Sequence, residues 1–261
     1  MNSDDLLQPH PRYAIDANRM YDLGSTARIA ELLAVRTEAR SDGWTQAFME
    51  AAWNASIEIP RAPFFEGPDG FTYLRLNVPR PGLPFESNCL ARQAEMLLST
   101  VRGAALFTDP DATEPAYVFP VGVIDAMVRF DNHQGDPIDL AEIRQAPHLS
   151  VDGAIRPNGE SLVGSPSRDF LPPHTAKGLH WHLVNGWGIA APKVALMVLK
   201  NAAPSRNLVI DRTINEIPGD PRHAEAVVRM LLWYLPPRRS ILLRPPSLAI
   251  RDMTLLSDYF E

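Results

Sequence analysis

The sequence predicts an α+β protein built from two regions. At residues 71–78, Leu74, Leu76 and Val78 alternate with Tyr73, Arg75 and Asn77, as in a strand. At residues 221–235, apolar residues recur every three to four positions, as in a helix. Between residues 158 and 261 the expected elements follow the order strand, helix, strand, strand, helix, strand. We expect this βαββαβ-like unit to form a sheet with its helices packed on one face.

Length and composition support two packed regions. The chain has 261 residues, of which 45% are hydrophobic and 21% are charged, as in a globular protein large enough for two domains. We divide it into an N-terminal arm (residues 1–24), an N-terminal α+β domain (residues 25–145) and a C-terminal α+β domain (residues 158–261). The polar, Gly- and Pro-broken stretch at residues 131–159 is the expected linker, with a short helix at residues 138–144.

The first domain shows alternating helix and strand patterns. Leu74 and Leu76 share one face of the strand at residues 71–78, and Tyr73 and Arg75 share the other. In order, we expect a helix capped by Ser25 or Thr26, a helix from Asp42 to about Ala55, strands at residues 57–60 and 71–78, a helix from about Ser87 that exits at Gly103, strands at residues 104–107 and 116–119, and a segment at residues 121–129 that could be helical or extended.

The second domain begins after the Asn158-Gly159 pair, which favours a tight turn. Residues 193–200 are almost continuously apolar, which predicts a central strand buried on both faces. In order, we expect a strand at residues 161–164, a helix started by Pro172 and Pro173 and ended at Gly186, strands at residues 193–200 and 207–212, a helix at residues 221–235 stopped by Pro236 and Pro237, a strand at residues 240–244, and a terminal helix or arm at residues 248–259.

Charge is distributed unevenly along the chain. Residues 1–146 hold 21 acidic and 12 basic side chains, whereas residues 147–261 hold 10 acidic and 13 basic ones. The contrast could support docking between the regions, a homo-oligomer with complementary faces, or simply two solvated surfaces. The overall charge of −6 disfavours nucleic acid as a partner, because phosphate binding requires clustered cations.

The N-terminal sequence and the cysteine content predict a cytoplasmic protein. No apolar run approaches the roughly 20 residues that cross a bilayer, so we expect no membrane partner. Acidic residues stand where a signal peptide carries basic ones. Cys89 is the one cysteine, so neither an intrachain disulfide nor a cysteine metal cage is possible, and we expect it to be a small residue at a helix start.

The C-terminal region resembles the C-terminal domain of the enhanced-serine-sensitivity (SseB-like) proteins of bacteria. The matching stretches are Val163-Gly164-Ser165-Pro166, Leu171-Pro172-Pro173, the strand at residues 193–199, Asn207-Leu208-Val209-Ile210, and the helix end Tyr234-Leu235-Pro236-Pro237. Ile57-Glu58-Ile59-Pro60 and Ala105-Leu106-Phe107-Thr108 are similar to that family's N-terminal domain. The resemblance implies a non-enzymatic regulatory or accessory protein and brings no catalytic residue.

Three histidines form the most noticeable polar cluster, at positions 174, 180 and 182. Three imidazoles could hold zinc if they converged. On a helix, however, His180 and His182 point about 200° apart, at about 100° per residue, so we expect no metal site. The same spacing turns Trp181 away from Leu179, the buried side. Trp181, flanked by histidines and with Trp187 nearby, is therefore a candidate interaction patch, unless another domain covers it.

Basic residues gather around the last strand. Arg238 and Arg239 precede it, Arg244 ends it, and Arg206 and Arg212 could add to the positive charge near this strand and the loop before it. They could bind an anion or an acidic partner, or pair with acidic groups of the same chain.

No catalytic motif is present in the sequence. It lacks the Gly-X-Ser-X-Gly elbow and both glycine-rich phosphate loops, and Asp109, Asp111 and Glu114 lack the ligand spacing of a calcium loop and are expected to form a solvated turn. We therefore expect no cofactor and a role in protein binding, with Trp181, His174, Arg238 and Arg239 as candidate binding residues. The alternative is an enzyme or small-ligand binder with a pocket assembled between the two regions from remote residues.

Overall fold

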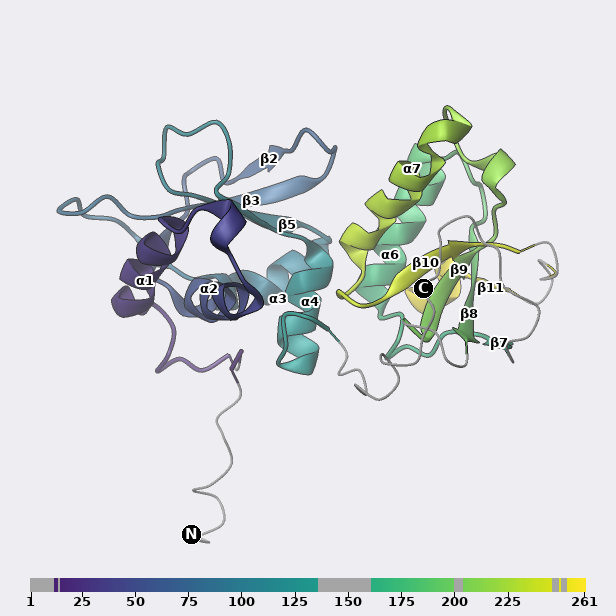
Figure 1. Ribbon diagram of the computed structural model, residues 1–261, viewed down its shortest axis with the longest axis horizontal. Coiled ribbons are helices and arrows are strands. Elements are labelled where there is room, and N and C mark those ends of the chain that lie inside the picture. The colour runs from purple at the N-terminus through teal and green to yellow at the C-terminus, as the bar shows by residue number, and fades with distance from the viewer. Residues whose placement is uncertain (1–11, 14, 136–160, 200–203, 246–248, 250–252) are drawn as a thin grey trace, which may run out of the picture. The chain divides into compact units, whose positions relative to one another are not determined.

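The computed structural model describes residues 12–13, 15–135, 161–199, 204–245, 249 and 253–261 (Figure 1). The chain divides into two compact units, unit 1 (Met1–His133) and unit 2 (Gln134–Glu261). Each contains helices and a mixed sheet, so the protein is α+β, as predicted. The expected linker boundaries at residues 145 and 158, the short helix at residues 138–144 and the Asn158-Gly159 turn lie outside the described residues.

Unit 1 is a mixed sheet in the order β4-β1-β3-β5-β6, with β2 paired to β3. Strands β3 and β5 are parallel, with α3 as the crossover, and the other pairs are antiparallel. The elements are α1 (Leu23–Leu33), α2 (Asp42–Asn54), β1 (Ile57–Glu58), β2 (Phe64–Glu66), β3 (Thr72–Asn77), β4 (Ser87–Asn88), α3 (Leu90–Thr100), β5 (Gly103–Phe107), β6 (Tyr117–Phe119) and α4 (Val121–Phe130), with a short 3-10 turn at Thr37–Ala39.

The predicted alternation in β3 is confirmed. Leu74 and Leu76 belong to the buried core that the helices share, together with Phe48 of α2. Figure 1 shows the helices of unit 1 on this side of the sheet. On the opposite face, the Tyr73 ring packs against Phe65 of β2, with 5.9 Å between ring centroids. Strand alternation thus supplies one helix-covered face and one face on which aromatic side chains of paired strands pack together.

Two helix ends in unit 1 differ from the prediction. Helix α1 is capped by Asp22, whose carboxylate accepts the Gly24 N–H, so neither Ser25 nor Thr26 caps it. Helix α3 exits through Val101 in the left-handed region (φ 54°), whereas Gly103 is the first residue of β5. A Cβ on Gly103 would lie 2.8 Å from the carbonyl oxygen of Phe119, so close strand packing explains this glycine.

Several elements of unit 1 depend on contacts distant in the sequence. Helix α4 resolves the ambiguous segment at residues 121–129, and β2 and β4 are short strands that the pattern does not predict. Part of the expected arm is firmly packed, because the Tyr13 side chain is 2% exposed. The Asp131 carboxylate accepts the backbone N–H groups of Arg12 and Tyr13, at 2.8 and 2.5 Å, and so ties the arm to the residues just after α4.

Unit 2 is a sheet in the order β10-β9-β8-β11, with β7 also paired to β8. Strands β9 and β10 are parallel and the other pairs are antiparallel. The elements are β7 (Ser161–Gly164), α6 (Pro173–Trp181) continued by a π turn (His182–Gly186), β8 (Lys193–Leu199), β9 (Arg206–Ile210), a 3-10 turn (Ile214–Glu216), α7 (Ala224–Met230) between 3-10 turns (Pro221–His223 and Leu231–Tyr234), β10 (Ser240–Leu243), β11 (Thr254–Leu255) and a 3-10 turn (Leu256–Tyr259).

The order of elements predicted for unit 2 is confirmed. Strand β8 is central, since it pairs with β9 on one side and with β7 and β11 on the other. Both α6 and α7 lie on one face of the sheet (Figure 1). The other face carries a separate core of Ala195, Met197, Leu199, Val209 and Met253.

Two predictions for unit 2 need correction. The helix expected at residues 221–235 is α-helical only at Ala224–Met230, and tighter 3-10 turns stand at both of its ends. Leu235 is extended, which suits a residue that precedes proline. The expected terminal helix or arm instead contains β11, which pairs with the first residues of β8, beyond the reach of β7. None of the helices in the described part of the chain is long and apolar enough to cross a membrane.

Candidate functional site

Helix α6 carries the two candidate residues that share one element, Trp181 and His174. Pro173 occupies its first turn, where a missing N–H costs nothing. One side of the helix is buried and consists of Thr175, Ala176, Gly178, Leu179 and, in the following π turn, Leu183. That packing fixes which side chains face outward.

Lys177 and Trp181 lie on the exposed side of α6, and His174, three residues before Lys177, has its ring Nε2 buried. We call His174, Lys177 and Trp181, spaced by three and four residues, the α6 stripe. Trp181 is 60% exposed and Lys177 is exposed, whereas His174 is half-buried. The predicted outward direction of Trp181 is confirmed, since Leu179 is fully buried. Lys177 was not among the candidate residues predicted from the sequence, although helical spacing from His174 and Trp181 places it between them.

The other two histidines lie on either side of α6. The His180 ring packs edge-on against Phe260, with centroids 5.3 Å apart. The His182 ring lies 5.8 Å from the Tyr234 ring, and its Nδ1 is 3.3 Å from the Tyr234 hydroxyl. Burial lowers the pKa of His182 below its ordinary value. The two imidazoles diverge as helical geometry predicts, and the described residues contain no group of three metal-ligating side chains.

The two candidate arginines have different environments. Arg239 is 8% exposed, and its guanidinium donates to the Phe170 carbonyl and lies 4.5 Å from the centroid of the Phe170 ring. It therefore anchors the segment that leads into α6. Arg238 is exposed, has a positive φ of 67°, and donates to the side-chain oxygen of Gln134. Of this pair, Arg238 is the one whose side chain solvent reaches freely.

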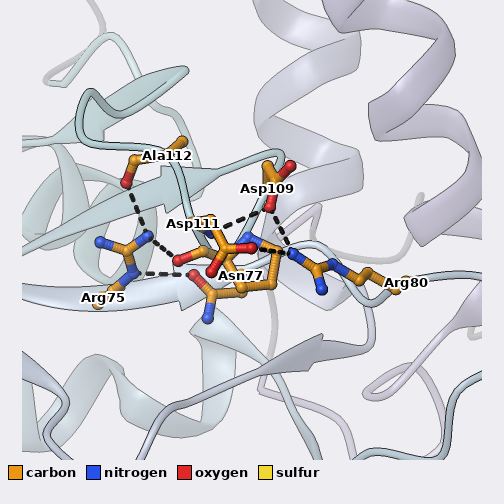
Figure 2. A network of polar contacts seen from close by, with 7 residues as sticks. Arg75, Asn77, Arg80, Asp109, Asp111 and Ala112 are labelled. Carbon is orange, nitrogen blue, oxygen red and sulfur yellow. Dashed lines mark hydrogen bonds and ion pairs between the residues drawn. The ribbon is translucent and has the colours of Figure 1, made fainter.

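A second polar cluster joins β3 and the segment after it to the loop between β5 and β6 (Figure 2). The Arg75 guanidinium donates to the carbonyl oxygens of Pro110 and Ala112, at 2.7 and 3.0 Å, and lies 3.7 Å from the centroid of the Phe107 ring. Its Nε donates to the side-chain oxygen of Asn77, at 3.0 Å. Arg75 thus fixes the loop between β5 and β6 onto the sheet.

Arg80 engages the acidic side chains of the same loop. Its guanidinium reaches Asp109 at 2.8 Å and Asp111 at 2.5 Å, and these carboxylates are 60% and 85% exposed. The backbone N–H of Asp111 and, next, Arg80 hold the pKa of Asp109 below its ordinary value. The expected solvated turn is confirmed. An arginine occupies the position between the two carboxylates, and their spacing does not give the ligand geometry of a calcium loop.

The comparisons with known proteins leave the resemblance to the SseB-like family a prediction. No protein-family model, curated protein or solved structure matches the chain.

Proposed function

We propose that the protein is a non-enzymatic interaction protein with a regulatory or accessory role in the bacterial cytoplasm, and that the α6 stripe is its docking surface. The observation that carries the proposal is Trp181, an indole 60% exposed on a helix whose other side is fully buried. This role agrees with what the SseB-like resemblance implies.

The physical reason is the cost of exposing a large indole. Tryptophan buries about 150–250 Å² when covered and is among the residues that most often dominate binding energy at interfaces. Because α6 is held by its packed side and by the Arg239 contact before it, Trp181 is presented on a rigid support. A rigid aromatic side chain loses little conformational entropy on binding. Truncation of Trp181 is thus expected to weaken binding by about 2–4 kcal/mol.

The charge beside Trp181 indicates the chemistry of the partner. Lys177 lies one helical turn away, and no described carboxylate forms an ion pair with it. Residues 147–261 carry a net charge of +3. We propose a partner surface with an apolar centre and an acidic rim. The acidic first half of a second copy of this chain has suitable charge, so a homo-oligomer is one form of the proposal.

Site-specific photocrosslinking tests the proposal directly. A benzophenone amino acid replaces Trp181 in the full chain, and the same group replaces Val163, which is 43% exposed on β7, as a matched control. We expect a discrete adduct from position 181 alone, and we expect Lys177→Glu to weaken it while Lys177→Arg preserves it. Mass spectrometry then distinguishes a second copy from another protein. Equal adducts at both positions, or none at position 181, would refute the proposal.

A further inference from the structure

Leu23, the first residue of α1, protrudes from unit 1. Its side chain is 64% exposed, more than any other large hydrophobic side chain among the described residues. Tyr21, two positions earlier, is 40% exposed. Single exposed apolar side chains are common on protein surfaces, but neighbouring ones form the kind of patch that marks an interface.

The backbone on either side of Leu23 is fixed. The Asp22 N–H donates to the carbonyl oxygen of Asn54, at 2.9 Å, and the Asp22 carbonyl accepts the Ser56 N–H, at 3.3 Å. The Asp22 carboxylate accepts the Gly24 N–H, at 2.8 Å, and so caps α1. Leu23 is therefore held in one place before any partner binds, which lowers the entropic cost of docking.

A hollow lies directly beside Leu23. Leu23 and Tyr21 line an open groove of about 740 Å³, whose opposite lining includes Ala47 and Ala51 of α2, one helical turn apart. Because alanine side chains end at Cβ, these two positions leave room for a large apolar side chain from another surface. We call this part of the groove the Ala47 hollow. The same patch thus contains a protruding side chain and a space that could receive one.

The charges that line the groove are balanced, although the region around them is acidic. The lining includes two cations and two carboxylates: Arg19, Arg28, Asp22 and Glu50. Residues 1–146 as a whole hold 21 acidic and 12 basic side chains, so two copies of this region repel each other over most of their surface. At a balanced patch, cations of one copy can meet anions of the other. The groove is therefore a place where a second copy can approach without this repulsion.

We propose that this patch is a self-association surface, through which two copies of the chain form a symmetric dimer. A twofold axis brings the same patch of both copies together, so a side chain that protrudes needs a hollow within that patch. The rotation that places Leu23 of one copy over the Ala47 hollow of the other also forms the reciprocal contact. Each dimer then contains the contact twice. The surface belongs to unit 1, is separate from the α6 stripe and does not depend on the proposed function.

Sedimentation velocity of the full chain over a range of concentrations tests the inference. We expect a monomer–dimer equilibrium whose dissociation constant rises about tenfold or more with Leu23→Glu and with Ala47→Trp. Leu83→Glu is the matched control, because Leu83 is 59% exposed on unit 1 and does not line the groove. Leu83→Glu and Trp181→Ala should both leave the dissociation constant unchanged. A chain that stays monomeric, or a dimer that Leu23→Glu leaves as tight, would overturn the inference.

A mixture of two variants separates the docking contact from any effect on folding. Leu23→Ala removes the protruding side chain and keeps the hollow, whereas Ala47→Trp fills the hollow and keeps Leu23. Neither variant can form the contact with its own copy, but a mixed dimer regains one of the two contacts. Native mass spectrometry distinguishes the mixed dimer by its mass, and we expect more of it than random pairing gives. Random pairing, or the absence of the mixed dimer, would refute the reciprocal contact.

Discussion

Arg75 and Arg80 both contact the loop between β5 and β6 of unit 1. Comparing them tests how strongly burial determines the contribution of an arginine side chain to the free energy of unfolding. We consider Arg75→Ala and Arg80→Ala, two identical truncations within one cluster (Figure 2). Arg75 is half-buried and makes three hydrogen bonds, two of them to loop carbonyls, and its guanidinium covers the Phe107 ring. Arg80 contacts two solvent-exposed carboxylates.

The expected magnitudes follow from these contacts. At about 1 kcal/mol net for each hydrogen bond, with a modest cation–π contribution, Arg75→Ala should destabilise unit 1 by about 2–4 kcal/mol. With a urea slope of about 2 kcal/mol per molar, the unfolding midpoint falls by about 1–2 M. Arg80→Ala should leave the midpoint unchanged, because water and salt screen exposed ion pairs.

Pulse-labelled hydrogen exchange during urea unfolding measures the midpoint of unit 1 separately from that of unit 2, through peptides that cover β5 and β6. Arg75→Lys is a useful control, because lysine keeps the charge but lacks the planar guanidinium that donates to several acceptors at once. Most of the stability loss expected for Arg75→Ala should therefore remain in Arg75→Lys. If Arg80→Ala destabilises unit 1 as much as Arg75→Ala does, the reasoning from burial and carbonyl contacts is wrong.

Three further outcomes are expected. Val101→Gly should stabilise unit 1 by about 0.5–1 kcal/mol in urea unfolding, because glycine adopts φ 54° without strain, and a loss would show that packing of the valine outweighs that strain. Burial lowers the pKa of His182, so in acid the folded state binds fewer protons than the unfolded chain. The free energy of unfolding of unit 2 should therefore be highest above about pH 6.5 and decline as the pH falls below that value. His182→Asn should flatten this dependence when unfolding is measured as a function of pH. Cys89 is fully buried and burial raises its pKa, so a colourimetric thiol reagent should react at pH 8 in urea but not with the native protein, and rapid native reaction would contradict this packing.

The sequence predicts those features that depend on neighbours along the chain. The alternation in β3 places Leu74 and Leu76 toward the helices, because successive side chains of a strand point to opposite faces. The same reasoning on α6 sends Trp181 outward and separates His180 from His182, because helical rotation is about 100° per residue. Spacing on a regular element is sufficient for each of these results.

Other features arise from contacts between distant residues. Asp131 fixes Tyr13 across 118 positions of sequence, and β11 forms because β7 leaves the first residues of β8 unpaired. The contact of Arg75 with the loop carbonyls requires the loop to fold back over β3, which no local pattern records.

The candidate sites divide in the same way. Local spacing on one helix indicates that Trp181 faces outward, since the opposite side of α6 carries the apolar residues that must be buried. The burial of Arg239 against Phe170, 69 positions away, follows only from tertiary packing.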